Sequence, residues 1–138
     1  MNLKKENGFS LIELLIVVVI IGIIAALAVP ALQKSIRATE NQSAYSALRT
    51  MGQAQASYYS QGNRYARLDE LNGSQNGALG ATSGTDILRG PFRFQLTTDP
   101  SDSTLQTSYT ILAARPVPGD VPYAVAIDQT GVITQIVP

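Results

Sequence analysis

The sequence predicts an α+β protein in which one long N-terminal helix packs, through its second half, on a small antiparallel β-sheet of three to four strands. Three observations predict this fold. An uncharged apolar run lies near the start, a helical stripe of apolar residues follows it, and apolar residues alternate in the last third of the chain. The chain has 138 residues, and about 100 of them remain for a polar head once the apolar run is set aside.

The first half of the helix is predicted to cross a membrane. From Leu14 to Gln33 there are 20 consecutive residues without a formal charge, and at about 1.5 Å per residue they span the ~30 Å of a hydrocarbon core. Pro30 removes a backbone donor, which predicts a kink or local unwinding. Gly22 is a second flexible point, and with Ala26 it forms a small-residue pair that lets another helix approach, although glycine is also simply common in membrane helices.

The second half of the helix is predicted to be amphipathic. Apolar residues recur there at three- and four-residue steps, as on one face of a helix: Ala44, Ala47, Leu48, Met51, Ala54 and Tyr58. No turn cluster separates this stripe from the apolar run. A single helix from about Phe9 to about Tyr59 is therefore predicted, roughly 75 Å long.

The chain after Tyr59 is predicted to form the sheet. Residues 60–91 are rich in Gly, Asn and Ser, and their apolar pair Leu68 and Leu71 indicates one helical turn in a long surface connection. Apolar side chains then alternate as in half-buried strands over residues 92–98, 105–113, 123–128 and 132–137. Turn residues separate strands at 99–102 and 128–131. The stripe of the long helix is the expected cover for this sheet.

The composition argues against an enzyme and against nucleic-acid binding. Ten basic and ten acidic side chains cancel, so no global field attracts the chain to an anionic partner. The absence of His and Cys removes the usual proton-transfer group, thiolate nucleophiles and common zinc ligands. No catalytic residue, cofactor or metal ligand is predicted. We interpret Asp99, Asp102, Asp120 and Asp128 as turn residues and not as a calcium site, because no loop of alternating oxygen ligands is present.

The N-terminal stretch KKENGFSLIELLIVVVIIGIIAALAVP resembles the amino-terminal signature of type IV pilins and of the related pseudopilins of type II secretion. The shared features are a basic leader ending in Gly8, an aromatic Phe9, Glu13 at the fifth position counted from Phe9, and an apolar run containing Gly22 and Pro30. The resemblance is close over about the first 30 residues. Beyond them it extends only to the architecture of long helix and sheet.

This resemblance implies how the chain matures and assembles. In the family, a membrane-embedded aspartyl peptidase cuts after the glycine and methylates the new amino terminus, and the subunits then polymerise through their helices. For this chain it implies a leader peptide of residues 1–8, N-methylation of Phe9 and a role for Glu13 in filament assembly. The rest divides into a transmembrane or filament-core half of the helix (9–34), an amphipathic half (35–60) and a globular head (61–138).

The energetics of Glu13 are consistent with a role in assembly. A charge at the centre of a membrane helix costs about 2.5–3.5 kcal/mol on insertion scales. The helix dipole returns roughly 0.3–1 kcal/mol, and an ammonium at about 4 Å adds about 4 kcal/mol at an effective dielectric near 20. The Phe9 amine of a neighbouring subunit is such a cation. Since the sum is close to zero, the pair is expected to fix axial register while apolar packing supplies affinity.

The expected function is a non-enzymatic structural subunit of a type IV pilus. Its expected partners are prepilin peptidase, the pilus assembly machinery and further copies of itself, and it is expected to pass from the bacterial inner membrane to an extracellular filament. One alternative is the major pseudopilin of a type II secretion system, although the chain lacks that group's Trp-Gly-x-Pro-Tyr-like stretch and has only Gly90-Pro91-Phe92. The other is a soluble exported binding module whose signal peptide is removed near Ala28.

Overall fold

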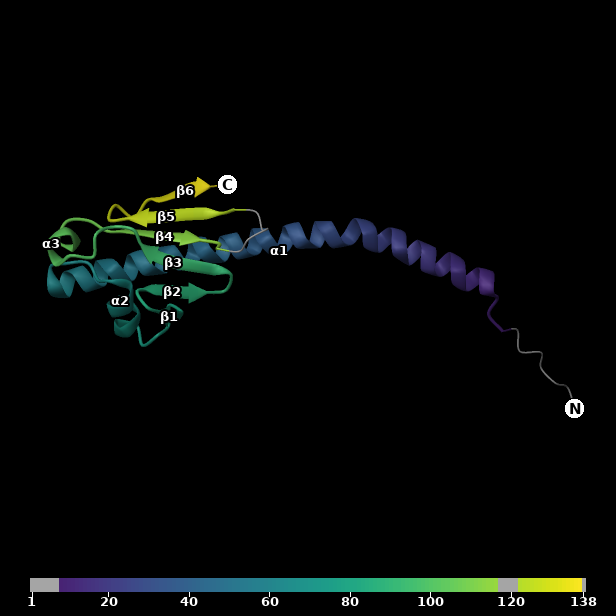
Figure 1. Ribbon diagram of the computed structural model, residues 1–138, viewed down its shortest axis with the longest axis horizontal. Helices are drawn as coiled ribbons and strands as arrows, with labels where there is room; N and C mark the ends of the chain where they lie inside the picture. Colours follow the sequence, from purple (N-terminus) through teal and green to yellow (C-terminus); the bar gives the residue numbers. More distant parts are fainter. Residues whose placement is uncertain (1–7, 117–121, 138) are drawn as a thin grey trace, which may run out of the picture. The chain divides into compact units, whose positions relative to one another are not determined.

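The structure is a computed structural model, and it describes residues 8–116 and 122–137. Figure 1 shows one long helix, a sheet and two short helices. The chain divides into two compact units, and the division falls inside the long helix between Ala38 and Thr39. The second unit contains the whole sheet, so the predicted α+β fold class is confirmed.

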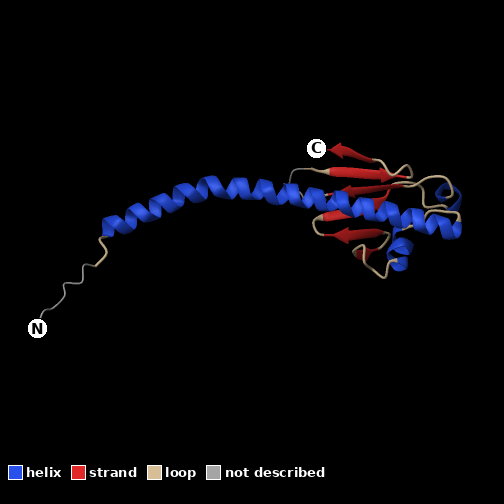
Figure 2. Ribbon diagram, turned by 180° about the vertical axis from the view of Figure 1, so that it is seen from behind, coloured by secondary structure: helices blue, strands red, loops and turns tan. Residues whose placement is uncertain are grey.

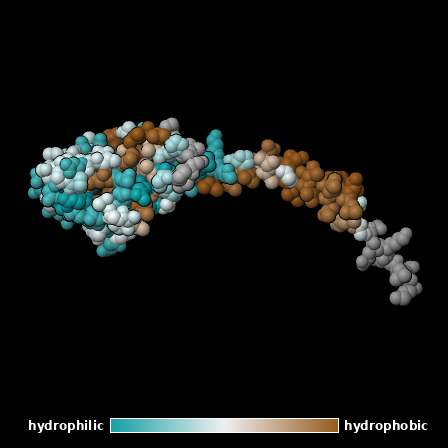
Figure 3. All heavy atoms as spheres, in the orientation of Figure 1, coloured by the Kyte–Doolittle hydropathy of each residue, from teal (hydrophilic) through white to brown (hydrophobic). Residues whose placement is uncertain are grey.

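Helix α1 runs from Leu11 to Gly62, close to the predicted extent. In the first unit every large apolar side chain from Phe9 to Ile36 is exposed, and the most covered, Val17, is still 45% exposed. Figure 3 shows a hydrophobic surface along the face of this helix that it draws. This helix contains a stretch of mean hydropathy 3.2 with no buried residue, so it is long and apolar enough to cross a membrane. The helix continues through Pro30, so the chain does not unwind there.

In the second unit, α1 covers one face of the sheet (Figure 2), and the predicted stripe is the buried face. Its buried apolar residues are Ala44, Ala47, Leu48, Met51 and Ala54. Tyr58 is half-buried against the same core. The approach is closest at Gly52, where an added Cβ would lie 2.6 Å from Cδ1 of Ile127. A residue without a side chain at this position therefore lets the helix come close to the strand that carries Ile127.

The sheet has six antiparallel strands that follow one another in chain order. They are β1 (Ala81–Ser83), β2 (Asp86–Arg89), β3 (Phe92–Leu96), β4 (Thr110–Ala114), β5 (Ala124–Asp128) and β6 (Ile133–Val137). In the register of β3 and β4, Phe94 pairs with Ala113 and Leu96 with Ile111. The alternating apolar residues of the strands thus point to the face covered by α1 and form one core with it.

The predicted number of three to four strands is wrong, because β1 and β2 form a hairpin within the stretch interpreted as a surface connection. All residues of β1 are exposed, and Ile87 is the one buried residue of β2. The hairpin turns at Gly84, whose φ of 63° favours glycine. Without an alternating apolar pattern, periodicity could not reveal these strands.

Two short helices complete the second unit. Helix α2 (Leu68–Ser74) confirms the helical turn predicted at Leu68 and Leu71, and both side chains are buried. Helix α3 (Asp102–Leu105) occupies the start of the stretch predicted as a strand from Leu105. That strand was therefore placed too early: β4 begins at Thr110, and Leu105 enters the core from a helix.

Buried Asn72 joins α2 to the hairpin. Its Nδ2 donates to the carbonyl of Gly80 at 2.9 Å and to Oγ1 of Thr82 at 2.8 Å, while its Oδ1 accepts from the backbone N–H of Leu79 at 3.1 Å. Gly80 has a φ of 151°, and a Cβ there would lie 2.6 Å from the carbonyl oxygen of Leu88. The Asn72 amide thus supplies hydrogen-bond partners for backbone groups of this loop.

Candidate functional site

The residues around the predicted cleavage point lie outside the helix. Gly8, Phe9 and Ser10 are exposed and not helical, and Phe9 is 86% exposed. Residues 1–7 of the predicted leader lie outside the described residues. An exposed, non-helical peptide bond is open to a peptidase, whereas a bond inside a helix must first unwind.

Glu13 lies in the first turn of α1 and folds back toward the chain that precedes it. Its Oε2 accepts a hydrogen bond from the backbone N–H of Ser10 at 3.0 Å, and the N–H of Leu14 donates to the carbonyl of Ser10 at 3.2 Å. Ser10 and Glu13 therefore stand in the S-x-x-E spacing of a capping box. The carboxylate satisfies a backbone donor at the positive end of the helix dipole.

No cation of the described chain neutralises Glu13. The ion pairs found over residues 8–116 and 122–137 involve Arg64, Arg67, Arg93 and Arg115, none of them with Glu13. Its only described polar contact is with the Ser10 N–H. The carboxylate is thus oriented by the helix start and has no ion pair with a described residue.

Gly22 and Pro30 do not lie close to Glu13 in the structure. They lie along the same helix, roughly 14 Å and 26 Å from it at 1.5 Å per residue. A Cβ added at Gly22 would meet no atom within 4 Å. No described residue therefore makes use of its small size, and its predicted role in helix flexibility stays a prediction, as does that of Pro30.

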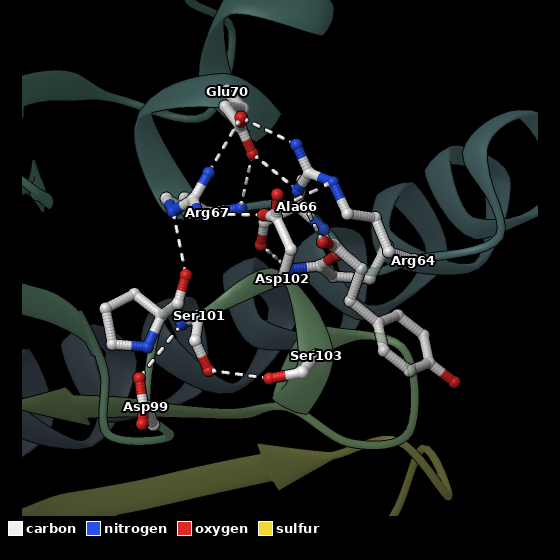
Figure 4. Close-up of polar contacts among 11 residues, drawn as sticks. Arg64, Ala66, Arg67, Glu70, Asp99, Ser101, Asp102 and Ser103 are labelled. Carbon is white, nitrogen blue, oxygen red and sulfur yellow. Dashed lines mark hydrogen bonds and ion pairs between the residues drawn. The ribbon is translucent and has the colours of Figure 1, made fainter.

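A second glutamate, Glu70, lies near the N-terminus of α2 in very different surroundings (Figure 4). Its two oxygens accept from Nη1 and Nη2 of Arg64, both at 2.9 Å, and Oε2 also accepts from the backbone N–H of Arg67 at 3.0 Å. The hydrogen bonds with Arg64 outweigh the effect of burial and lower the pKa of Glu70 from 4.5 to about 2, and the same pairing raises the pKa of Arg64. This carboxylate stays ionised because its cations are supplied by the chain itself.

Arg67 extends this cluster to the segment that contains α3. Its Nε donates to the carbonyl of Pro100 at 2.9 Å and its Nη2 to Oδ1 of Asp102 at 2.8 Å. On the other side, the buried amide of Gln55 both donates to and accepts from the backbone of Ala66 at 2.8 Å. The cluster therefore ties the end of α1, α2 and α3 together, which is a structural task.

The aspartates considered for calcium have other partners. Asp99 accepts from the N–H of Ser101 at 2.9 Å, Asp128 accepts from the N–H of Thr130 at 2.9 Å, and Asp102 pairs with Arg67. Asp120 lies outside the described residues. Within the part of the chain that the structure describes, no three His, Cys, Asp or Glu side chains are grouped as for a metal ion.

Several residues that organise these regions were not singled out from the sequence. Ser10 carried a readable signal, the spacing of the capping box with Glu13. Gln55, Asn72 and Arg115 carried none, because their partners are distant in sequence or are backbone atoms. Arg115, whose side chain is 2% exposed, pairs with Glu40 at 2.9 Å.

Comparison with known proteins bears on the N-terminal segment above all. Residues 3–29 match the family described as the prokaryotic N-terminal methylation motif. The type IV major pilin protein PilA of Myxococcus xanthus (strain DK1622) is 42% identical over 62 residues, which are 45% of this chain and 28% of that protein. The type II secretion system core protein G of Aeromonas hydrophila is 33% identical over 70 residues, 51% of this chain and 49% of the relative.

The matches thus cover about half of this chain and at most about half of the length of these relatives. No solved structure matches the chain significantly. The resemblance to type IV pilins and pseudopilins that the sequence predicted is confirmed by the motif and by both relatives. The fold of the head, residues 61–138, is known here from the structure and not from these matches.

Proposed function

We propose that this chain is a structural subunit of a type IV pilus, because its N-terminal segment matches the prokaryotic N-terminal methylation motif and is similar to a type IV pilin and to a type II secretion protein. It is made as an inner-membrane precursor, cut between Gly8 and Phe9 by prepilin peptidase, and methylated at Phe9. The assembly machinery then adds it to a filament of many copies outside the cell. It has no catalytic task.

The observation that carries this proposal is the exposed apolar surface of the first unit. Between Phe9 and Ile36, every large apolar side chain is exposed, although burying one of them gains about 1.5–3 kcal/mol. Such a surface needs lipid or other helices around it. A segment that is apolar on all sides suits both environments in turn, the bilayer before assembly and a bundle of identical helices in the filament.

Glu13 gives the bundle its register. Its carboxylate is fixed at the first turn by the Ser10 N–H but has no cation among the described residues. In the proposed filament, the methylated amine of a neighbouring Phe9 supplies that cation. An unpaired charge costs more in a bundle of apolar helices than a paired one, so a subunit shifted along the axis is disfavoured.

The test of maturation is the intact mass of the chain purified from membranes and from filaments. A chain that begins at Phe9 with one added methyl group supports the proposal. A mature chain that begins at Val29 would contradict it and would support cleavage of a signal peptide near Ala28.

The second candidate is the major pseudopilin of a type II secretion system. The observation in its favour is the match to core protein G, which covers 51% of this chain against 45% for the pilin. The two functions differ in where the filament ends. A pilus subunit should be abundant in filaments sheared from the cell surface, whereas a pseudopilin should stay with the envelope at normal expression.

A further inference from the structure

The second unit has one exposed apolar patch on its described surface. Val132 and Ile136 are 59% and 58% exposed, and they are the large apolar residues left exposed beyond Ile36. We call them the β6 patch. Strand β6 is the last strand of the sheet, so one of its edges is unpaired, and Figure 3 shows hydrophobic atoms at this edge. Residues 132–137 carry no charge, although exposed sheet edges are usually protected by charges.

The same unit has an apolar slot on a different part of its surface. The slot lies between α1 and the turn that joins β2 to β3, and its volume is about 220 Å³. It exceeds the ~150 Å³ of an apolar cavity that admits benzene, so a branched aliphatic side chain fits. Its lining includes Ala44, Ala47, Pro91, Phe92 and Phe94, with Glu40, Ser43 and Arg89.

The charges beside the slot and the β6 patch are complementary. At the slot, Glu40 is neutralised by Arg115 at 2.9 Å, whereas exposed Arg89 forms no ion pair with any described residue. Arg89 therefore places a positive charge beside the slot. The β6 patch follows the turn that begins at Asp128, whose carboxylate accepts hydrogen bonds from Thr130 and forms no ion pair with a described residue.

The slot and the β6 patch of one chain do not meet. Strand β6 is three strand spacings away from β3 in the sheet order, about 14 Å at ~4.8 Å per spacing. We propose that the β6 patch of one copy inserts into the slot of the next copy, with Asp128 facing Arg89. This contact joins two different surfaces, so each copy can bind one neighbour on each side and the assembly stays open, as a filament requires. The inference rests on the proposed function and adds a specific contact between heads.

The test uses the full-length chain, which has no native cysteine. The double variant Ser43→Cys with Ile136→Cys places one thiol at the slot and one on the β6 patch. Treatment of cells with a short bismaleimide should give a ladder of dimers, trimers and higher multimers. Each single variant should stay monomeric. The control variant, Gln106→Cys with Ile136→Cys, uses an exposed residue outside the slot and should give no ladder.

Charge variants sharpen the test. Arg89→Glu in the double-cysteine background should lower the multimer yield by up to about five-fold, the effect of losing one exposed ion pair. Filaments that contain the double variant without a ladder would overturn the head contact and leave the proposed function intact. Dimers from Ile136→Cys alone would overturn it in favour of β6 pairing with β6. Absence of the chain from any wild-type filament would overturn the proposed function and the contact with it.

Discussion

Glu13 and Glu70 begin two helices with the same local hydrogen bond but have opposite surroundings. Each carboxylate accepts from the backbone N–H three residues earlier, at 3.0 Å in both cases. Glu70 also receives two hydrogen bonds from Arg64, whereas Glu13 has no cation among the described residues. The same local hydrogen bond thus positions both carboxylates, but among the described residues a cation accompanies Glu70 alone.

The same contrast holds for the apolar residues of the two units. The first unit leaves its apolar side chains exposed, and the second buries its own in a core with the sheet. Stability of the second unit should therefore depend on the chain alone. The first unit should gain its stability from lipid or from other copies, and variants in the two units should have separable effects.

The largest effect is expected for Glu13→Ala. The variant should insert in the membrane at least as well as wild type, because a costly charge is gone, yet it should not enter filaments. Glu13→Gln, which keeps the size but loses the Coulomb attraction, should be strongly impaired too. The measurement compares membrane and filament pools, with processing checked by mass. A normal filament yield from correctly processed Glu13→Ala would contradict the contrast drawn between Glu13 and Glu70, since assembly would then not depend on a cation that pairs with Glu13.

The next largest effect is expected for Leu48→Asp in the second unit. Leu48 is fully buried, so a carboxylate there should lower the free energy of unfolding by several kcal/mol. Thermal melting of a truncated chain that starts at Ser35 measures this loss. Gln53→Asp, at an exposed position on the same helix, is the matched control and should melt close to wild type. Equal melting temperatures of the two variants would show that the stripe is not part of the core.

Glu70→Gln should have a smaller, pH-dependent effect. The pKa of Glu70 falls from 4.5 to about 2 in the folded chain, so its ionised form stabilises the fold above about pH 4.5. This contribution is lost as the pH falls toward about 2. At pH 7 the variant should lose about 2 kcal/mol, the scale of a charged hydrogen bond in a partly exposed site. The difference between variant and wild type should shrink in denaturant titrations between pH 4.5 and 2; a constant difference would contradict the assigned cause.

The smallest effect is expected for Pro30→Ala. The alanine supplies an N–H for the carbonyl of Ala26, so amide exchange around residue 30 should slow in detergent micelles. The melting temperature of the second unit should not change, because Pro30 belongs to the first. A shift in that melting temperature would show that the two units do not behave independently.

Much of this architecture was predictable, because burial leaves a periodic signal. The stripe from Ala44 to Tyr58 and the alternation in β3 and β5 both predicted the buried face correctly. The β1–β2 hairpin gave no such signal, since six of its seven strand residues are exposed or half-buried and its position depends on Asn72.

The candidate site was predictable in part. Gly8, Phe9 and Glu13 were predicted from the motif, and their roles stay predictions. The S-x-x-E spacing is also the one that allows the hydrogen bond between Ser10 and Glu13. The ion pair of Arg115 with Glu40 joins residues 75 positions apart, and no local pattern encodes such a pair. The slot was equally hidden, because its lining comes from segments that meet only after folding.

The strict chain order of the strands has a consequence for folding speed. Each strand of the sheet pairs with its neighbour in sequence, so the sheet can form by adding one hairpin after another without closing long loops first. Pairings of this kind keep the mean sequence separation of contacts low, and two-state proteins with low contact order fold faster. The long-range step is the docking of α1, whose Gly52 must reach Ile127. We therefore expect the sheet to form early and the helix to dock late, so the apolar stripe of α1 stays uncovered until the sheet is in place.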